Sequence, residues 1–169
     1  VSDTNKPADE AIQYSLRLVD GAISEMRALV FELRPETLVN EGLVVALSKQ
    51  AKSLCDRHSI VATFDFEMGD PPLPYASQEA LYRIAVEALQ NVIKHARATE
   101  VRMRLHVEHG QICLTVADNG VGFDVEREYV GHLGLVSMRE RAAQIGATLG
   151  FTSAPGATVS VSLRLLDVE

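Results

Sequence analysis

Residues 87–96, Glu-Ala-Leu-Gln-Asn-Val-Ile-Lys-His-Ala, and residues 118–122, Asp-Asn-Gly-Val-Gly, are the two stretches that decide the fold of this chain. In a helix of about 3.6 residues per turn, the polar side chains of the first stretch share one face; they are Glu87, Asn91, Lys94 and His95. The other side is apolar and is predicted to face a core, through Leu81, Ile84, Ala85, Ala88, Leu89 and Val92. Such a polar line can hold a magnesium ion and a phosphate chain, although a merely solvated face is the alternative.

The second stretch follows a segment that alternates like a β-strand, residues 111–117. Asp118 has the same parity as the apolar residues of that segment, so its carboxylate points toward the core, where it is costly without a hydrogen-bond donor. Gly120 and Gly122 then allow a tight turn of the backbone. A strand that simply ends in an Asp-Asn-Gly turn is the alternative for this stretch taken alone.

Together the two stretches resemble the asparagine box and the first glycine box of histidine kinase-like ATPases, which have the Bergerat fold. Residues 131–141, Gly-His-Leu-Gly-Leu-Val-Ser-Met-Arg-Glu-Arg, are similar to the second glycine box of the nitrate-sensor-like subfamily of sensor histidine kinases. Residues 155–158, Pro-Gly-Ala-Thr, resemble the final Gly-Thr turn, although Ala157 stands where the family often has another glycine. The resemblance covers roughly residues 38–166, and four motifs in the right order make it specific.

The resemblance implies a role for each polar residue of the first stretch. Asn91 would coordinate Mg²⁺ through its side-chain oxygen, and Glu87 would act in catalysis by orienting a metal-bound water or assisting the attacking group. Lys94 is expected to reach phosphate oxygens, and His95 is expected to contact the phosphates or the lid. The implied cofactors are therefore ATP and Mg²⁺.

The resemblance also implies how the nucleotide is held. Asp118 would accept a hydrogen bond from the adenine amino group, so the ligand would supply the missing donor. Gly120 and Gly122 would let the backbone approach the nucleotide, and Thr158 would close the base pocket from the side of the sheet. The candidate lid covers residues 124–135, and its expected nucleotide-binding residues are Gly131, His132, Leu133, Gly134 and Leu135.

An apolar repeat in residues 8–34 predicts a separate helix. Its residues step alternately by four and three, as in a coiled-coil seam: Ile12, Leu16, Val19, Ile23, Met26, Val30 and Leu33. We interpret residues 1–37 as part of a dimerisation and phosphotransfer bundle, its second helix, and residues 38–169 as the catalytic ATP-binding domain. A helix packed on its own domain is the alternative.

The remaining pattern predicts an α/β fold, a two-layer sandwich in which helices cover one face of a mixed, mostly antiparallel sheet. Helices are expected at 42–58, 76–96 and 133–145. Strands are expected from 61, at 101–107 and 111–118, and in a last hairpin formed by 149–151 and 159–165.

Net charge, apolar runs and cysteine spacing limit the binding partners and the cellular compartment that we expect for this chain. The net charge of −7 argues against a nucleic-acid surface, because a phosphate backbone requires Lys and Arg. The sequence has no apolar run of membrane-spanning length and no signal peptide, so we expect no membrane contact by this chain. Cys55 and Cys113 have no CxxC partner and are expected to be reduced and buried, which suits the cytoplasm. The full-length protein could still be attached to a membrane elsewhere.

These observations predict the ATP-binding domain of a two-component sensor histidine kinase, a homodimer when full-length. It would transfer the γ-phosphoryl group to a histidine upstream of this chain, for relay to an aspartate of a response regulator. In the family that the motifs resemble, the acceptor histidine lies beside an acidic residue on a helix upstream of the one expected at 8–34. None of the five histidines has that setting: His58, His95, His106, His109 and His132. The alternatives are an anti-sigma-factor serine kinase and a nucleotide-binding module without transfer activity.

Overall fold

The structure is a computed structural model, and it describes residues 35–67, 69–122, 133–153 and 155–165. Nearly all of these residues belong to one compact unit, Thr37–Glu169. The segment with the heptad pattern, residues 8–34, lies outside the described residues, so its predicted helix remains a prediction.

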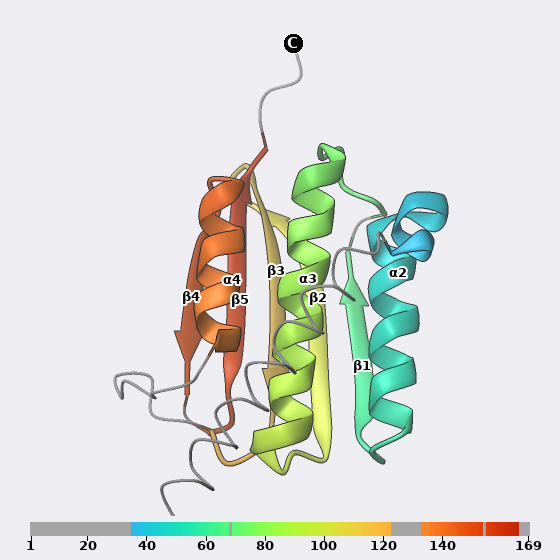
Figure 1. The fold of residues 1–169 in the computed structure, drawn as a ribbon, viewed down its shortest axis with the longest axis vertical. Coiled ribbons are helices and arrows are strands. Elements are labelled where there is room, and N and C mark those ends of the chain that lie inside the picture. The colour runs from blue at the N-terminus through green and yellow to red at the C-terminus, as the bar shows by residue number, and fades with distance from the viewer. Residues whose placement is uncertain (1–34, 68, 123–132, 154, 166–169) are drawn as a thin grey trace, which may run out of the picture. The chain divides into compact units, whose positions relative to one another are not determined.

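Three helices and five strands make up the described fold (Figure 1). The helices are α2 (Glu36–Asp56), α3 (Tyr75–Asn91), which continues into a π-helical turn (Val92–Ala96), and α4 (Leu133–Gln144). The strands are β1 (Val61–Phe66), β2 (Glu100–Glu108), β3 (Gln111–Asp118), β4 (Thr148–Thr152) and β5 (Thr158–Arg164). The strand order is β1-β2-β3-β5-β4, with β1 parallel to β2 and every other pair antiparallel.

The helices lie on one face of this sheet, as Figure 1 shows, so the predicted two-layer sandwich is confirmed. The sheet is two-faced because successive side chains of a strand point to opposite sides. Along β2, Val101, Met103 and Leu105 are buried under the helices, whereas Arg102 and Arg104 lie on the open face. Arg104 there forms ion pairs with Asp65 and Glu67, both at 3.0 Å, which join β2 to the parallel edge strand β1.

The core is contributed by all three helices and the inner strands. Each fully buried Leu, Ile or Met side chain contributes about 1.5–3 kcal/mol relative to exposure. The largest of these side chains are Leu43, Leu47, Leu81, Ile84, Leu89, Met103, Leu105, Ile112, Leu114 and Met138. Among the described residues one charged side chain is buried with them: Arg83 is only 7% exposed and pairs with Glu79 of the same helix at 2.7 Å.

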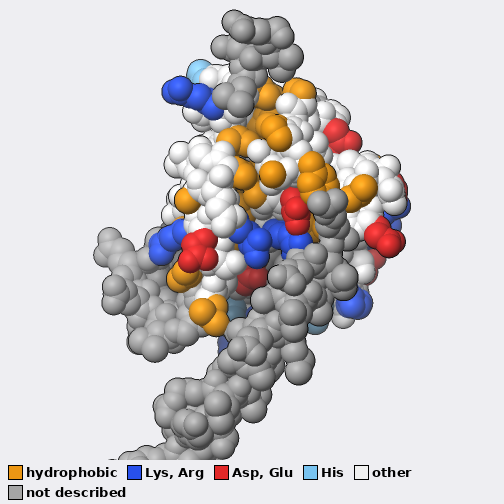
Figure 2. All heavy atoms as spheres, turned by 45° about the horizontal axis from the view of Figure 1, so that its top comes forward, with side chains coloured by type: hydrophobic (Ala, Val, Ile, Leu, Met, Phe, Trp, Pro, Cys, Tyr) orange, Lys and Arg blue, Asp and Glu red, His pale blue; other side chains and the backbone are white. Residues whose placement is uncertain are grey.

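The surface mixes charge with apolar patches. Figure 2 shows hydrophobic side chains gathered in the upper part of the face it presents, above a band where basic and acidic side chains lie close together. Exposed ion pairs such as that of Lys49 with Glu41 contribute roughly 0–1 kcal/mol each. The described fold is therefore held mainly by its core. No described helix is long and apolar enough to cross a membrane.

Two predicted helix boundaries were wrong in detail. The helix expected at 42–58 begins at Glu36, ends at Asp56 and is kinked at Gly42, whose φ is 84° and ψ is 176°. Beyond this kink the Val44 N–H donates to Asp70 Oδ1 at 2.8 Å, so a carboxylate distant in sequence satisfies a free donor at the restart of the helix. The helix expected at 76–96 is α-helical only to Asn91 and then widens into the π-helical turn.

We expect Gly42→Ala to lower the free energy of unfolding by about 2 kcal/mol. This backbone conformation is essentially restricted to glycine, and an added Cβ would overlap the Asp70 carboxyl group. Urea unfolding of the variant measures the loss. Gly69→Ala is the matched control, because a Cβ there meets nothing within 4 Å. Equal unfolding midpoints for the two variants would contradict the proposed role of the kink.

Candidate nucleotide-binding site

Asp118 ends β3, and hydrogen bonds to its backbone and to its carboxylate hold it on two sides. Its own N–H donates to the carbonyl oxygen of Ala157 at 2.9 Å, and the Gly120 N–H donates to Asp118 Oδ1 at 2.7 Å. A donor within the chain thus already satisfies one carboxylate oxygen. The expectation that a ligand must supply the donor therefore applies only to the remaining hydrogen-bonding capacity of Asp118.

Asn119 has a structural role that the sequence reasoning missed. Its Oδ1 accepts hydrogen bonds from the N–H groups of Thr99 and Glu100, at 2.9 and 3.0 Å. Its Nδ2 donates to Thr99 Oγ1 at 2.9 Å. The middle residue of the Asp-Asn-Gly turn therefore fixes the turn to the start of β2, and the preference of Asn for turns was the available signal.

The two motif stretches meet at the end of the π-helical turn. The Val121 N–H donates to the carbonyl oxygen of Ala96 at 2.9 Å. Gly120 packs so closely on the same carbonyl group that any Cβ at this position would overlap it. Arg97 then reverses the chain with φ 51°. The wider π-helical turn places the Ala96 carbonyl at this junction, in keeping with the frequent occurrence of π-turns at functional sites.

A cavity of about 430 Å³ opens beside this junction. A volume of this size is typical of small-molecule sites. Among the residues predicted for the site, the structure brings Asn91, His95, Asp118, Gly122 and Leu135 to the cavity wall. The other described lining residues are apolar: Ala88, Val92, Ala96, Val116, Ala157 and Val159. The wall therefore combines an apolar slot with a few polar groups at its edge.

Thr158 does not line this cavity, contrary to the expectation from the final turn. Ala157 and Val159 line it instead, and Thr158 lies between them in β5. Because alternate side chains of a strand point to opposite faces, Thr158 points to the open face of the sheet. Thr158 is an odd number of residues from the buried Val161 and Leu163, whereas Ala157 is an even number of residues from both. This pattern in the sequence could have identified Ala157 as the residue that lines the cavity.

Glu87 lies outside the cavity wall, at the contact between α3 and α4. An added Cβ on Gly134, in the first turn of α4, would overlap Glu87 Oε1, so this glycine makes room for the carboxylate. A negative charge is favoured at a helix N-terminus. Arg141 of α4 belongs to the same charged group: burial lowers its pKa, Arg83 adds to that shift, and acidic residues including Glu87 oppose it.

The remaining predicted residues have other positions. Lys94 is exposed on the π-helical turn, and Leu133 is 60% exposed at the start of α4. Gly120 supports the cavity from the junction with Ala96 rather than lining it. Gly131 and His132 lie outside the described residues.

A known protein family matches more than half of this chain. Residues 76–167 match the family described as histidine kinase-, DNA gyrase B- and HSP90-like ATPases. The chain belongs to this family. ATP binding is the common property of histidine kinase ATPase domains. The narrower assignment to the nitrate-sensor-like subfamily stays a prediction.

Full-length relatives of this ATPase domain are sensor kinases. The sensor histidine kinase LiaS of Bacillus subtilis is 32% identical over 164 residues, which cover 95% of this chain and 45% of LiaS. The histidine-protein kinase/phosphatase DegS of Brevibacillus brevis is 30% identical over 170 residues, 98% of this chain and 44% of DegS. The chain thus spans less than half the length of these relatives.

A solved structure has the same fold as the ATPase domain. The histidine kinase domain of the Erythrobacter litoralis EL346 blue-light-activated kinase superposes with a TM-score of 0.61. The match covers 70% of this chain and 59% of that chain, at 24% sequence identity. At this identity the likeness supports the fold alone.

We expect Gly120→Ala to weaken binding of ATP by about tenfold or more. The added methyl group must displace the Ala96 carbonyl, and overpacking of this kind costs about 1–3 kcal/mol. Isothermal titration calorimetry measures the affinity, and urea unfolding shows whether the fold is kept. Gly69→Ala is again the control. A Gly120→Ala variant with unchanged affinity would show that the junction does not shape the site.

Proposed function

We propose that this chain is the catalytic ATP-binding domain of a two-component sensor histidine kinase. It transfers the γ-phosphoryl group of ATP to a histidine on another segment of the kinase, from which the phosphate passes to an aspartate of a response regulator. The observation that carries this proposal is the position of Asp118: its carboxylate lies in the wall of an otherwise largely apolar cavity, oriented by the Gly120 N–H.

The apolar lining of the cavity and the acceptor oxygen of Asp118 both suit an adenine base. The apolar side chains of Ala88, Val92 and Val159 remove the flat ring from water. Asp118 Oδ1 accepts from Gly120, so we assign the other oxygen, Oδ2, to the adenine amino group. An acceptor at this place selects a purine that carries an amino donor, because a carbonyl oxygen in the same position would face a negative charge.

Asn91 and His95 lie on the cavity wall at the π-helical end of α3 and would face the phosphate chain. The amide oxygen of Asn91 is the hard ligand type that Mg²⁺ prefers, and we assign it to that ion. Bound Mg²⁺ would neutralise phosphate charge. Lys94 is exposed one residue before His95, and its flexible ammonium group would reach the outer phosphate oxygens.

We assign Glu87 to the attacking group or to a metal-bound water. It lies one helical turn before Asn91, and its carboxylate occupies the space beside Gly134 at the start of α4. Catalysis of phosphoryl transfer depends mainly on positioning and on charge neutralisation, so a carboxylate held in place contributes without a covalent step.

The proposed partners follow from the transfer of phosphate from ATP to a histidine and then to an aspartate. The full-length kinase would be a homodimer that uses residues 8–34, its partner would be a response regulator, and this domain would work in the cytoplasm. The sensor-kinase names of LiaS and DegS favour this function over that of an anti-sigma-factor serine kinase. Transfer of phosphate to a supplied acceptor helix distinguishes the kinase from a module that only binds nucleotide.

We expect Asp118→Asn to lower the affinity for ATP roughly 5- to 150-fold, equivalent to about 1–3 kcal/mol. The asparagine carbonyl can still accept from Gly120, so its amide NH₂ replaces the acceptor that faces the base. ITP carries a carbonyl oxygen in place of the amino group, so the preference for ATP over ITP should fall or reverse. Calorimetry with both nucleotides measures this ratio.

Asp65→Asn, on the open face of the sheet, is the control and should leave both affinities unchanged. An unchanged ATP-to-ITP ratio in Asp118→Asn would refute the assignment of the base.

We expect Asn91→Ala and Glu87→Gln to separate binding from transfer. Asn91→Ala should remove the Mg²⁺ dependence of nucleotide binding, because it deletes the proposed oxygen ligand. Glu87→Gln should bind ATP with nearly unchanged affinity yet transfer phosphate about 10²- to 10⁴-fold more slowly, as expected for loss of an acid–base group. Labelled ATP and a supplied acceptor helix measure the transfer.

Asn40→Ala and Glu100→Gln are the matched controls, since both residues are exposed and lie outside the cavity wall. Transfer at the wild-type rate by both site variants would show that the metal and catalytic assignments are wrong.

A further inference from the structure

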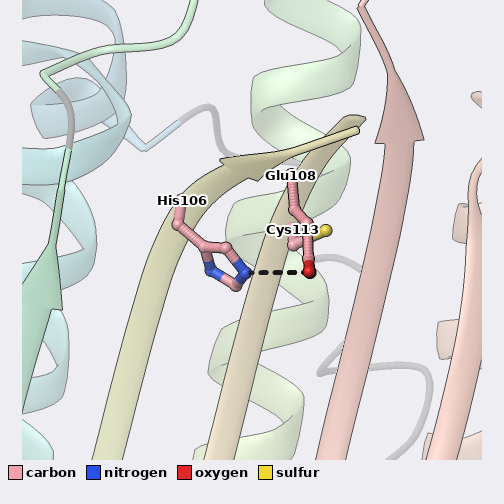
Figure 3. Close-up of side chains that lie close together, drawn as sticks. All are labelled: His106, Glu108 and Cys113. Carbon is pink, nitrogen blue, oxygen red and sulfur yellow. Dashed lines mark ion pairs between the residues drawn. The ribbon is translucent and has the colours of Figure 1, made fainter. Parts of the chain in front are cut away.

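Three side chains with different ligand atoms gather on the open face of the sheet, at the closed end of the β2–β3 hairpin. They are an imidazole, a carboxylate and a thiol, from His106, Glu108 and Cys113 (Figure 3). His106 and Glu108 are two residues apart in β2 and so point to the same face, and Cys113 is the cross-strand partner of His106. One ligand atom from each residue lies within 4.8 Å of the other two.

The hairpin holds these groups in register. Its turn is formed by His109 and Gly110, with φ of 49° and 73°, the two positive values typical of a tight two-residue turn. The Gly110 carbonyl also accepts from the Leu165 N–H at 3.0 Å, which ties the turn to the end of β5. Sites built on regular, paired strands keep their geometry better than sites on loops.

His106 presents one ring nitrogen to the cluster. Its side chain is 17% exposed, and its Nε2 lies 3.7 Å from Glu108 Oε2, the contact drawn in Figure 3. Its Nδ1 is buried and has no hydrogen-bond partner among the described residues. Nε2 is therefore the nitrogen available to a cation, and the ring proton would then stay on Nδ1.

We propose that His106 Nε2, Cys113 Sγ and a Glu108 carboxylate oxygen bind one Zn²⁺ ion, with water as the fourth ligand. The mixture of nitrogen, sulfur and oxygen fits Zn²⁺, which takes all three in tetrahedral sites. Mg²⁺ and Ca²⁺ prefer oxygen ligands alone. On binding, the Cys113 thiol loses its proton to solvent and the sulfur coordinates as thiolate.

This site is separate from the nucleotide cavity and does not depend on the proposed function. Cys113 is five residues from Asp118 along β3, about 17 Å at 3.4 Å per residue. It also lies on the opposite face of the sheet from the helices. A cation here would link β2 to β3 by side chains, in addition to their backbone hydrogen bonds, and would stabilise the closed end of the hairpin.

The affinity should be moderate. Three protein ligands bind Zn²⁺ less tightly than a closed set of four, and Glu108 is largely exposed. The buried Nδ1 also lacks the acceptor that usually supports a ligating histidine, and such support is worth about 10- to 100-fold in affinity. We therefore expect a dissociation constant on the order of micromolar rather than nanomolar.

Titration of the whole chain with Zn²⁺ tests the proposal, and Co²⁺ serves as a spectroscopic probe. Both titrations are made in excess Mg²⁺ and without nucleotide. One equivalent should bind per chain, and bound Co²⁺ should show thiolate-to-metal charge-transfer absorption. His106→Gln and Cys113→Ser should each weaken Zn²⁺ binding at least tenfold, and Cys113→Ser should abolish that absorption. Glu108→Gln changes an exposed side chain, so it tests the site without a risk to folding.

The controls are two other histidines and the other cysteine, changed in His58→Ala, His109→Ala and Cys55→Ala. His109 is the most informative, because it is 88% exposed and its Nδ1 lies 3.8 Å from Glu108 Oε1. All three control variants should keep the wild-type affinity. Binding that survives both Cys113→Ser and Glu108→Gln, or that is lost in His109→Ala but not in His106→Gln, would overturn the proposal.

Discussion

The junction between the Ala96 carbonyl and the Gly120–Val121 backbone is the constraint on which the rest of the site depends. It joins the end of the polar-faced helix to the turn after β3 through one hydrogen bond of 2.9 Å and one contact too close for any Cβ. Asn91 and His95 are placed from one side of this junction, and Asp118 from the other. Because both sides are anchored in the core, the polar groups are held together at the cavity wall.

Two further contacts hold the turn after β3, residues 118–122, and they account for the residue types found there. Asn119 holds it to the start of β2, and Gly156 packs against the Asp118 carbonyl where the Ala157 oxygen accepts from the Asp118 N–H. Each fastening uses backbone groups that would otherwise lie unpaired at the end of the sheet, and buried unpaired groups are costly. Asn119, the middle residue of the Asp-Asn-Gly motif, therefore fixes the turn to the sheet. The side chain of its neighbour Asp118 lies at the cavity wall.

The two faces of the sheet carry side chains of different chemical character. Its covered face contributes Val116 and Val159 to the cavity and aims Asp118 into it, whereas its open face carries charged and sulfur-containing side chains. This division follows from the two-residue period of a strand. It also means that the cluster of His106, Glu108 and Cys113 can change, or bind a cation, without moving a residue of the nucleotide cavity. The paired backbone of β2 and β3 is the connection between the two faces.

The sequence by itself determined the fold class, the order of the strands and helices, the apolar face of α3 and the motif residues Asn91, His95, Asp118 and Gly122 that reach the cavity. The elements and the apolar face follow from local periodicity and turn chemistry, which act over a few residues. The grouping of the motif residues in one site came from the resemblance of the motifs to a known family. Only the tertiary structure decided that α3 widens into a π-helical turn, that Glu87 rests against Gly134, and that Ala157 rather than Thr158 forms the wall. Most of these depend on groups brought together by packing. The spacing of residues along the chain does not specify such contacts.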